Sequence, residues 1–321
     1  MPPITFIYTN SLDLTADLVI SRLGPDEVFR FNCDLWREYK IKIDPHGFFI
    51  ENPAGRFLQS RDIAKFYWRR PHMSSRLYPD RHIPEEIVYM EEEVYYAFRD
   101  MVNLLWSEGK VVLTEPMADS RIGKLVQLKV ARKYFKLPSY KFVSGSPDYF
   151  EKDKASVVKS LSSERIKGNL VLFTTRIAED KLDPSTPWLI QEYVPATRDV
   201  TVVFVRGEVF GFELNREDFL ERTVDWREMG PETATDAWLP HTLSGNMTES
   251  IRFFMADLGL HFGRLDLLFG EGEYFFLEVN ANGEWAWLDF DGKNGLLESI
   301  LKEISPLTPR HSIPISRGIS L

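Results

Sequence analysis

Acidic and amide side chains recur in two strand-like segments near the C-terminus, where apolar residues separate them. In the segment GRLDLLF, the period-two alternation of a strand puts Arg264 and Asp266 on one face. In YFFLEVN, the same alternation puts Glu278 and Asn280 together. Four apolar residues are expected to be buried behind these polar faces: Leu265, Leu267, Leu277 and Val279.

A hairpin between the two strands would bring their polar faces together. A three-residue loop, 271–273, puts Asp266 opposite Glu278. It also puts Arg264 opposite Asn280, whereas an even loop would separate the carboxylates. Facing carboxylates repel unless a cation lies between them, and Mg²⁺ binds such oxygen ligands together with phosphates. The pair predicts a magnesium nucleotide site; the alternative is an acidic, solvent-facing side of an amphipathic hairpin.

Other residues could bind the rest of a nucleotide. Lys159 lies in the apolar run SVVKSL, where an ammonium needs an anion such as phosphate. Backbone groups of 191–194 could bind an adenine edge, and Asp199 could accept from a ribose. The common phosphate-loop, dinucleotide, zinc-protease and serine-hydrolase motifs are absent, and the six histidines are scattered.

Composition excludes several classes of protein. The 321 residues suffice for two domains or one large one, and the net charge of -9 with a pI near 5.3 argues against a nucleic-acid binder. The single cysteine, Cys33, excludes a disulfide framework and suits a reducing compartment. Neither a signal peptide nor an apolar run long enough for a membrane is seen, so we expect a soluble cytoplasmic protein.

The elements that must position these residues change along the chain. From residue 4 to about 70, short β-rich runs alternate with turn residues, as in a small α/β or α+β domain. Apolar residues at steps of three and four predict a long helix over 84–109. A new unit is predicted near residue 118, opening with a helix over 119–138 that Pro138 ends.

The second unit is mainly strands, followed by one helix and a tail. The run 199–214 is predicted to be a hairpin with its turn at 206–208. A helix is predicted over 247–258, capped by Asn246. The segment 307–321 has no hydrophobic period and is expected to be a tail.

Taken in order, these features resemble ATP-grasp ligases. The matching features are Lys124 in a helix, Lys159 in a strand, FTTRI, QEYVP with Asp199, DWR, GRLD and FLEVNANGEW. Within that family the chain most resembles the graspetide synthetases, which macrocyclise microviridin-type precursor peptides. The likeness covers residues 118 to 305, and YWRRP at 67–71 resembles the preceding domain of that group.

The resemblance implies an α/β (α+β) architecture: an ATP-grasp fold after an N-terminal pre-ATP-grasp α/β domain. The implied limits are 1–117 for the first domain, 118–306 for the ATP-grasp domain with a lid over about 140–198, and 307–321 for the tail. The stretch 160–168 would be a mobile cover over the phosphates.

The resemblance also implies a role for each candidate site residue. Lys124 and Lys159 would contact the ATP phosphates, and Lys159 would also lie near the base. The adenine hinge and the ribose contact would be Gln191, Glu192, Val194 and Asp199. Magnesium would be held by Asp266, Glu278 and Asn280. Charge on the transferring phosphoryl group would be neutralised by Arg227 and Arg264.

The implied activity is that of an ADP-forming carboxylate ligase that uses ATP and Mg²⁺. Its partner would be a precursor peptide with a leader and an acidic core containing Thr and Glu, and the enzyme would be a homodimer. Through an acyl phosphate it would join Asp or Glu carboxylates to Thr or Ser hydroxyls or to Lys amines. The alternatives are a ligase for a small amino acid or a protein terminus, and a non-catalytic ATP-binding module.

Three positions depart from the family pattern. Thr201 stands where Arg is common, Ala281 where Pro is usual, and Glu284 where Gln is usual. We expect Trp285 and Trp287 to pack against the sheet. The RRP at 69–71 could guide an acidic peptide or pair with nearby carboxylates, and the three glutamates at 91–93 are expected to be solvated.

Overall fold

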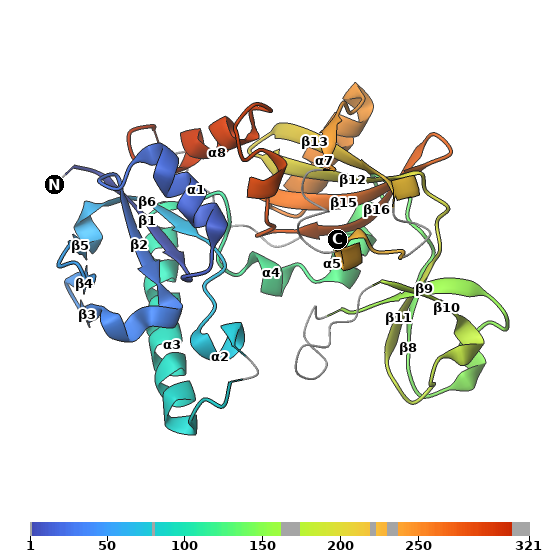
Figure 1. Cartoon of the computed structure of the whole chain (residues 1–321), viewed down its shortest axis with the longest axis horizontal. Helices are drawn as coiled ribbons and strands as arrows, with labels where there is room; N and C mark the ends of the chain where they lie inside the picture. The colour runs from blue at the N-terminus through green and yellow to red at the C-terminus, as the bar shows by residue number, and fades with distance from the viewer. Residues whose placement is uncertain (1, 79–80, 162–173, 219–222, 230–236, 310–321) are drawn as a thin grey trace.

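The chain folds into an N-terminal unit, on the left of Figure 1, followed by two further sheets, which both lie on the right. The computed structural model describes residues 2–78, 81–161, 174–218, 223–229 and 237–309. Helices and strands are mixed throughout, as the sequence predicts.

The N-terminal unit contains a parallel sheet and a small antiparallel one. The parallel sheet has the order β2-β1-β6-β7, formed by β1 (Ile4–Thr9), β2 (Val28–Asn32), β6 (Ile63–Trp68) and β7 (Val111–Val112). The antiparallel sheet is formed by β3 (Lys40–Asp44), β4 (Gly47–Glu51) and β5 (Phe57–Gln59). Every residue of β1 is buried, which is typical of a central strand covered on both faces.

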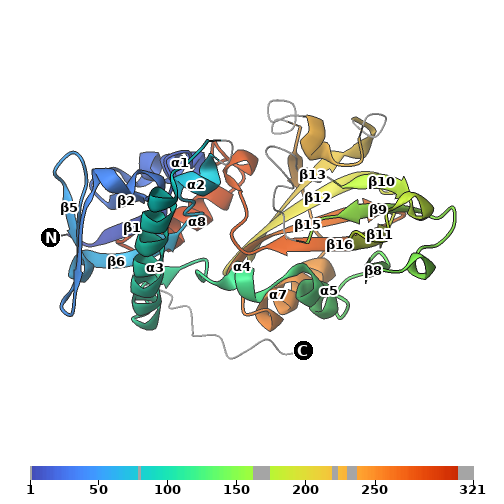
Figure 2. The same ribbon diagram turned by 90° about the horizontal axis from the view of Figure 1, so that it is seen from below.

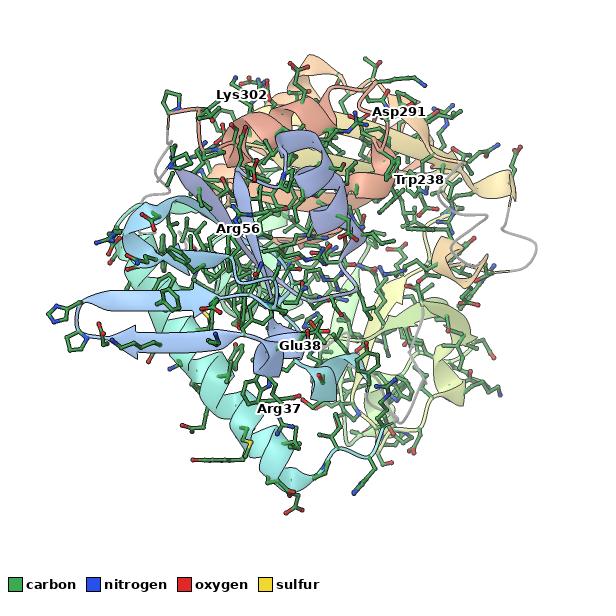
Figure 3. All side chains as sticks on the ribbon, turned by 60° about the vertical axis from the view of Figure 1, so that its left-hand side comes forward. Arg37, Glu38, Arg56, Trp238, Asp291 and Lys302 are labelled. Carbon is green, nitrogen blue, oxygen red and sulfur yellow. The ribbon has the colours of Figure 1, made fainter. Side chains whose placement is uncertain are left out.

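Arg56 ties the small sheet to the N-terminal strands. Its guanidinium donates to the carbonyls of Pro25, Asp26 and Val28, at 2.5, 2.9 and 2.7 Å. Figure 3 labels Arg56 and shows the β3–β4 hairpin projecting beside α3.

The helices in the described residues of this unit are α1 (Leu14–Leu23), α2 (Ser74–Leu77) and α3 (Glu85–Ser107). The last confirms the long helix predicted over 84–109. One expectation for it is wrong, because Glu91 is buried and accepts from the backbone and hydroxyl of Ser75. Glu92 and Glu93 are exposed, as expected for a solvated face.

The single helix predicted over 119–138 is also wrong. The structure has two short helices, α4 (Ala118–Arg121) and α5 (Lys124–Ala131). Gly123 separates them with extended backbone angles, φ -69° and ψ 162°, and forms the N-cap of α5. The break puts Lys124 in the first turn of the second helix.

A four-stranded antiparallel sheet follows. Its order is β10-β9-β11-β8, formed by β8 (Tyr140–Val143), β9 (Ala155–Lys159), β10 (Thr175–Ala178) and β11 (Trp188–Glu192). Most of the cover expected over 160–168 lies outside the described residues.

The C-terminal sheet has five antiparallel strands in the order β14-β13-β12-β15-β16. They are β12 (Arg198–Val205), β13 (Glu208–Asn215), β14 (Leu239–His241), β15 (Phe262–Gly270) and β16 (Glu273–Asn280). The β12–β13 turn has positive φ at Arg206 and Gly207, which confirms the predicted hairpin. Helices α5 and α7 (Gly245–Asp257) cover one face (Figure 2). The cap of α7 is Ser244 rather than Asn246, because its hydroxyl accepts from the N–H of Met247.

The last helix, α8 (Leu296–Ile304), joins the two halves of the molecule. It lies in one apolar core with residues of the N-terminal unit and of the C-terminal sheet, among them Ile7, Val19, Tyr67, Val203 and Phe212. Short 3-10 turns complete the described chain: η1 (Cys33–Glu38), η2 (Ser60–Asp62), η3 (Pro147–Tyr149), η4 (Glu179–Lys181), η5 (Arg216–Asp218), η6 (Trp226–Met229) and η7 (Ala286–Leu288).

Candidate active site

A cavity of about 330 Å³ lies between the four-stranded and the five-stranded sheets. All the predicted site residues except Asn280 line it. These are Lys124, Lys159, Gln191, Glu192, Val194, Asp199, Arg227, Arg264, Asp266 and Glu278. Residues more than 150 positions apart in the sequence therefore meet in one place.

The β15–β16 hairpin has the predicted pairing but not the predicted loop. Asp266 lies opposite Glu278, and Arg264 opposite Asn280. The turn contains only Glu271 and Gly272, both with positive φ, as in a type I′ turn. A bulge between Asp266 and Leu267 shifts the register by one residue and restores the predicted pairs.

The bulge also changes which apolar residues face the helices. Leu267 pairs with Phe276, so Phe276 and Val279 lie in the core with α5 and α7. Leu277, which was expected to be buried there, instead lines the cavity. Leu265 and Leu267 are buried as predicted.

Glu278 has two lysines for neighbours. Its Oε2 lies 3.0 Å from Nζ of Lys124, which also donates to the carbonyl of Ser160 at 2.8 Å. Burial alone would raise the pKa of Glu278, but Lys124 and Lys159 lower it below the usual value. Burial lowers the pKa of Lys159 to about 8, although Glu278 opposes the shift. One carboxylate thus serves as counter-ion to both lysines.

Asp266 is held by three side chains. Its Oδ2 accepts from Nη2 of Arg264 at 3.2 Å and from Nδ2 of Asn280 at 3.4 Å. Its Oδ1 accepts from the hydroxyl of Thr201 at 3.1 Å. Thr201, one of the three departures, therefore orients a predicted magnesium ligand.

The carboxylate pair fits a hard divalent cation. Asp266 and Glu278 face each other across the hairpin, and the Asn280 amide lies beside them. In the part of the chain that the structure describes, no group of three or more His, Cys, Asp or Glu side chains gathers as a metal site. Two carboxylates and an amide suit Mg²⁺, which usually keeps ligand positions for phosphates and water.

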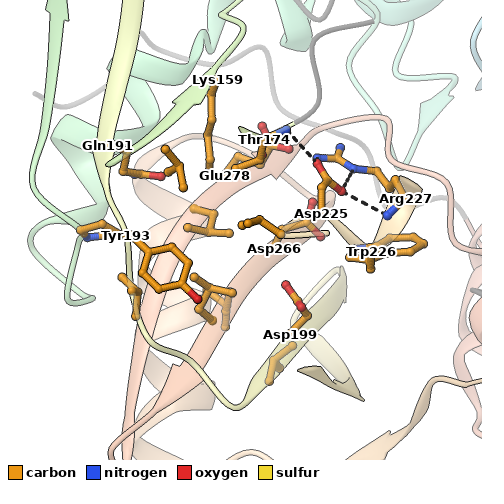
Figure 4. A pocket seen from close by; sticks show the side chains of 18 of the residues that line it. Lys159, Thr174, Gln191, Tyr193, Asp199, Asp225, Trp226, Arg227, Asp266 and Glu278 are labelled. Atoms are coloured by element: carbon orange, nitrogen blue, oxygen red, sulfur yellow. Dashed lines mark hydrogen bonds and ion pairs between the residues drawn. The ribbon is translucent and has the colours of Figure 1, made fainter. Parts of the chain in front are cut away.

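The end of β11 forms the side of the cavity where Gln191 and Tyr193 lie (Figure 4). Glu192 accepts from the backbone and hydroxyl of Ser139, which lowers its pKa. Its side chain is therefore already occupied. Among the described residues, none accepts a hydrogen bond from the N–H of Val194.

Asp199 lies at the start of β12 and is paired with an arginine that the sequence did not single out. Nη1 of Arg216 lies 2.8 Å from its Oδ2. Burial raises the pKa of Asp199 to about 7, and the nearby carboxylates of Asp225 and Asp266 add to the shift while Arg216 opposes it.

The DWR segment orients Arg227. Asp225 is buried and accepts from Nε and Nη2 of Arg227, each at 2.7 Å, and from the N–H of Thr174 at 3.2 Å. Figure 4 shows these contacts at the end of the cavity opposite Gln191. Burial opposes the charge of Arg227, but Asp225 raises its pKa, so the guanidinium remains charged.

Sequence reasoning missed Asp225, Arg216, Trp226 and Trp238, which also line the cavity. Asp225 lies two positions before Arg227 in DWR, and this spacing could have pointed to Asp225. The tryptophans could not have been found this way, since Trp226 and Trp238 contact each other and Trp287 only in the fold, with ring centroids 5.4 to 5.7 Å apart. Trp285 is fully buried in the core, as expected.

Comparisons of the sequence alone with known proteins find no match. No protein-family model and no curated protein sequence matches the chain. None of the helices in the described ranges is long and apolar enough to cross a membrane.

Solved structures are similar over nearly the whole chain. An ATP-grasp ligase associated with a ribosomally made peptide in Chryseobacterium gregarium, in complex with ADP and a leader and core peptide, has 22% identity and a TM-score of 0.76, covering 100% of both chains. The macrocyclase MdnC of Microcystis aeruginosa, bound with its precursor peptide MdnA, has 23% identity and a TM-score of 0.75, covering 94% of this chain and 99% of its own.

The similarity extends to a more distant ligase. D-alanine–D-alanine ligase from Bacillus anthracis, complexed with ATP, has 11% identity and a TM-score of 0.52, covering 95% of each chain. The sheets, their order along the chain and the cavity between them show that this protein has the ATP-grasp fold.

Proposed function

We propose that this protein is an ADP-forming ligase that macrocyclises a ribosomally made precursor peptide. The observation that carries the proposal is the cavity itself. It gathers two lysines, two facing carboxylates and three arginines between the sheets of an ATP-grasp fold. This set can bind a triphosphate and neutralise charge during phosphoryl transfer.

Each part of the nucleotide has a proposed partner. The N–H of Val194, beside Gln191 and Glu192, would bind the adenine edge, and Asp199 the ribose. Lys124 and Lys159 would contact the phosphates, which would replace Glu278 as their counter-ion.

Magnesium would be held by the facing carboxylates with Asn280 beside them. These ligands are Asp266 and Glu278. The cation would offset the negative charge of the phosphates. Arg227, held by Asp225, and Arg264, held by Asp266, would meet the charge that develops on the transferring phosphoryl group.

The proposed chemistry has two steps, and no enzyme nucleophile is needed. A side-chain carboxylate of the peptide takes the γ-phosphoryl group, and ADP leaves. A Thr or Ser hydroxyl, or a Lys amine, then attacks the acyl carbon; phosphate leaves and the attacking group loses a proton. The net change is an ester or amide with the loss of one water per ring, and the protein contributes by positioning and charge neutralisation.

The peptide substrate is supported by the similar structures. Two of them, from Chryseobacterium gregarium and Microcystis aeruginosa, hold precursor peptides and match almost the full chain. D-alanine–D-alanine ligase is less similar, which disfavours a small amino acid as substrate. Asp225 and Arg227 lie at the end of the cavity opposite Gln191, and these charged residues disfavour a module that only binds ATP.

Further parts of the proposal follow from the resemblance. The precursor would have a leader and an acidic core with Thr and Glu. The enzyme would act as a homodimer. It would be cytoplasmic, where the free thiol of Cys33 would stay reduced. Sedimentation equilibrium tests the dimer.

A peptide-dependent ATPase assay tests the activity. With Mg²⁺, an acidic peptide carrying Thr and Glu should stimulate ADP formation, and the product mass should fall by one water per ring. Hydroxylamine should trap the activated carboxylate as a hydroxamate on Asp or Glu. Formation of AMP and pyrophosphate would refute the proposed phosphoryl transfer.

A further inference from the structure

The loop after β16, residues 281–285, is held from one side by the N-terminal unit. Arg69 directly follows β6, and its side chain is completely buried. Its Nη1 donates to both the backbone and the side-chain oxygen of Asn282, each at 3.3 Å. Its Nη2 donates to Oε2 of Glu284. One planar guanidinium thus holds the loop at two residues.

Glu284 is the centre of a balanced ion cluster. Its Oε1 accepts from Nη1 of Arg70, and its Oε2 from the hydroxyl of Thr15, each at 2.8 Å. Arg69 also lies 3.4 Å from Asp13, so two arginines face two carboxylates. Burial would raise the pKa of Glu284, but Arg69 and Arg70 lower it, so its carboxylate stays charged.

The same loop contacts the candidate active site on its other side. The backbone carbonyl of Glu284 accepts from Nη1 of Arg264 at 3.2 Å, while Nη2 of Arg264 donates to Asp266. Gly283 packs so closely that a Cβ there would lie 2.8 Å from Cβ of Arg264. The loop and Asp266 therefore together determine where this guanidinium points.

We propose that Arg69 and Glu284 are positioning residues for phosphoryl transfer and act through residues 281–285 on Arg264. Neither side chain lines the cavity, so neither contacts the substrates there. This inference rests on the proposed function. Without the pair, the loop would shift and Arg264 would leave the place where charge develops.

Variants of Glu284 separate positioning from mere stability. Glu284→Ala removes the acceptor and should lower the kcat of peptide-dependent ADP formation about ten- to a hundredfold, with the KM for ATP changed less than about twofold. Glu284→Gln should recover most of this loss, because its amide oxygen can still accept from Arg69. Arg69→Lys should resemble Glu284→Ala, since one ammonium cannot hold both Asn282 and Glu284.

Glu303→Ala is the matched control. Glu303 pairs with Arg206 at 2.9 Å and joins segments distant in sequence, but neither residue lines the cavity. Its side chain is 9% exposed, against 35% for that of Glu284. Because Glu303 is the more buried of the two, this variant should lose at least as much thermal stability as Glu284→Ala and keep its kcat. Equal kcat values for Glu284→Ala and Glu303→Ala would overturn the proposal, and so would a Gln variant as slow as the Ala variant.

Hydrogen exchange tests the same pair without catalysis. Amides in the fragment 281–288 should exchange faster in Glu284→Ala than in the wild type, and at the wild-type rate in Glu303→Ala. If the wild type forms no ADP with any peptide, the proposed function fails while this readout still decides whether the pair holds the loop. Unchanged exchange in Glu284→Ala would contradict the positioning role.

Discussion

At the scale of single residues, the candidate active site depends on charges that burial has brought close together. Lys159 lies in β9 with its pKa lowered to about 8 by burial, and Glu278 is shared between it and Lys124. The sequence predicted that the ammonium needs an anion, because an unpaired charge in an apolar strand is costly. It could not predict the shared carboxylate, since that contact depends on how two sheets meet.

The lowered pKa of Lys159 predicts a pH-dependent affinity for nucleotide. Below pH 8 the ammonium is charged and attracts the phosphates; above it the neutral amine does not. The affinity for a non-hydrolysable ATP analogue should therefore be constant below this pH and fall by up to about tenfold per pH unit above it. Calorimetry in a pH series measures this. Lys159→Arg is the control. Because arginine stays charged, the affinity of this variant for the analogue should not fall above pH 8. The same slope in both proteins would assign the titration to another group.

Asp225 should matter for rate rather than for nucleotide binding. Nε and Nη2 of Arg227 bond to different oxygens of Asp225, so Asp225→Asn replaces one acceptor with a donor. We expect kcat to fall about ten- to a hundredfold with little change in the Kd for an ATP analogue, because the guanidinium acts mainly in the transition state. Steady-state kinetics beside calorimetry checks this. Asp183→Asn, in a loop away from the cavity, should change neither quantity, and a weakened Kd in Asp225→Asn alone would point to ground-state binding.

At the scale of elements, the β15–β16 hairpin shows how far strand alternation can be used. Alternation correctly paired Asp266 with Glu278, because polar and apolar faces must each stay together. The three-residue loop was wrong, since a two-residue turn and a bulge have the same effect on register as one longer loop. A bulge depends on twist and packing across the sheet, which a single strand does not encode. Likewise, the apolar spacing of 119–138 did not reveal the break at Gly123.

The turn of this hairpin gives a direct stability prediction. Gly272 has φ +79° with open space around it, so Gly272→Ala adds backbone strain without a clash. The free energy of unfolding should fall by about 1 kcal/mol. Gly245→Ala is the control, because this helical glycine has open space and no positive φ, and the change should be neutral or stabilising. Urea denaturation measures both, and equal effects would reject the turn geometry.

At the scale of the whole molecule, the N-terminal unit and the C-terminal sheet share one apolar core. Helix α8 contributes Leu296, Ile300 and Ile304, which are fully buried at helical spacing. The sequence showed an order of elements that resembles an ATP-grasp protein, but a buried face does not reveal what covers it. The limits proposed for the two domains, 1–117 and 118–306, therefore remain predictions, although the fold is confirmed.

A shared core predicts that the two halves unfold together. Ile300→Ala should cost about 2 to 5 kcal/mol, and far-UV circular dichroism and tryptophan fluorescence should give coincident transitions. Leu307→Ala, at an exposed side chain, should change stability by less than about 0.5 kcal/mol. Two separate transitions, with only one shifted in Ile300→Ala, would show that the core does not couple the halves.

Oxygen labelling shows whether the peptide carboxylate is activated by phosphorylation. A substrate peptide with ¹⁸O in its Asp and Glu side chains is incubated with the enzyme, ATP and Mg²⁺, and the released phosphate is analysed by mass spectrometry. One ¹⁸O atom is expected in the phosphate for each ring formed, because the carboxylate oxygen leaves with the phosphoryl group. Ring formation with ¹⁸O in AMP, or with unlabelled phosphate, would contradict this mechanism.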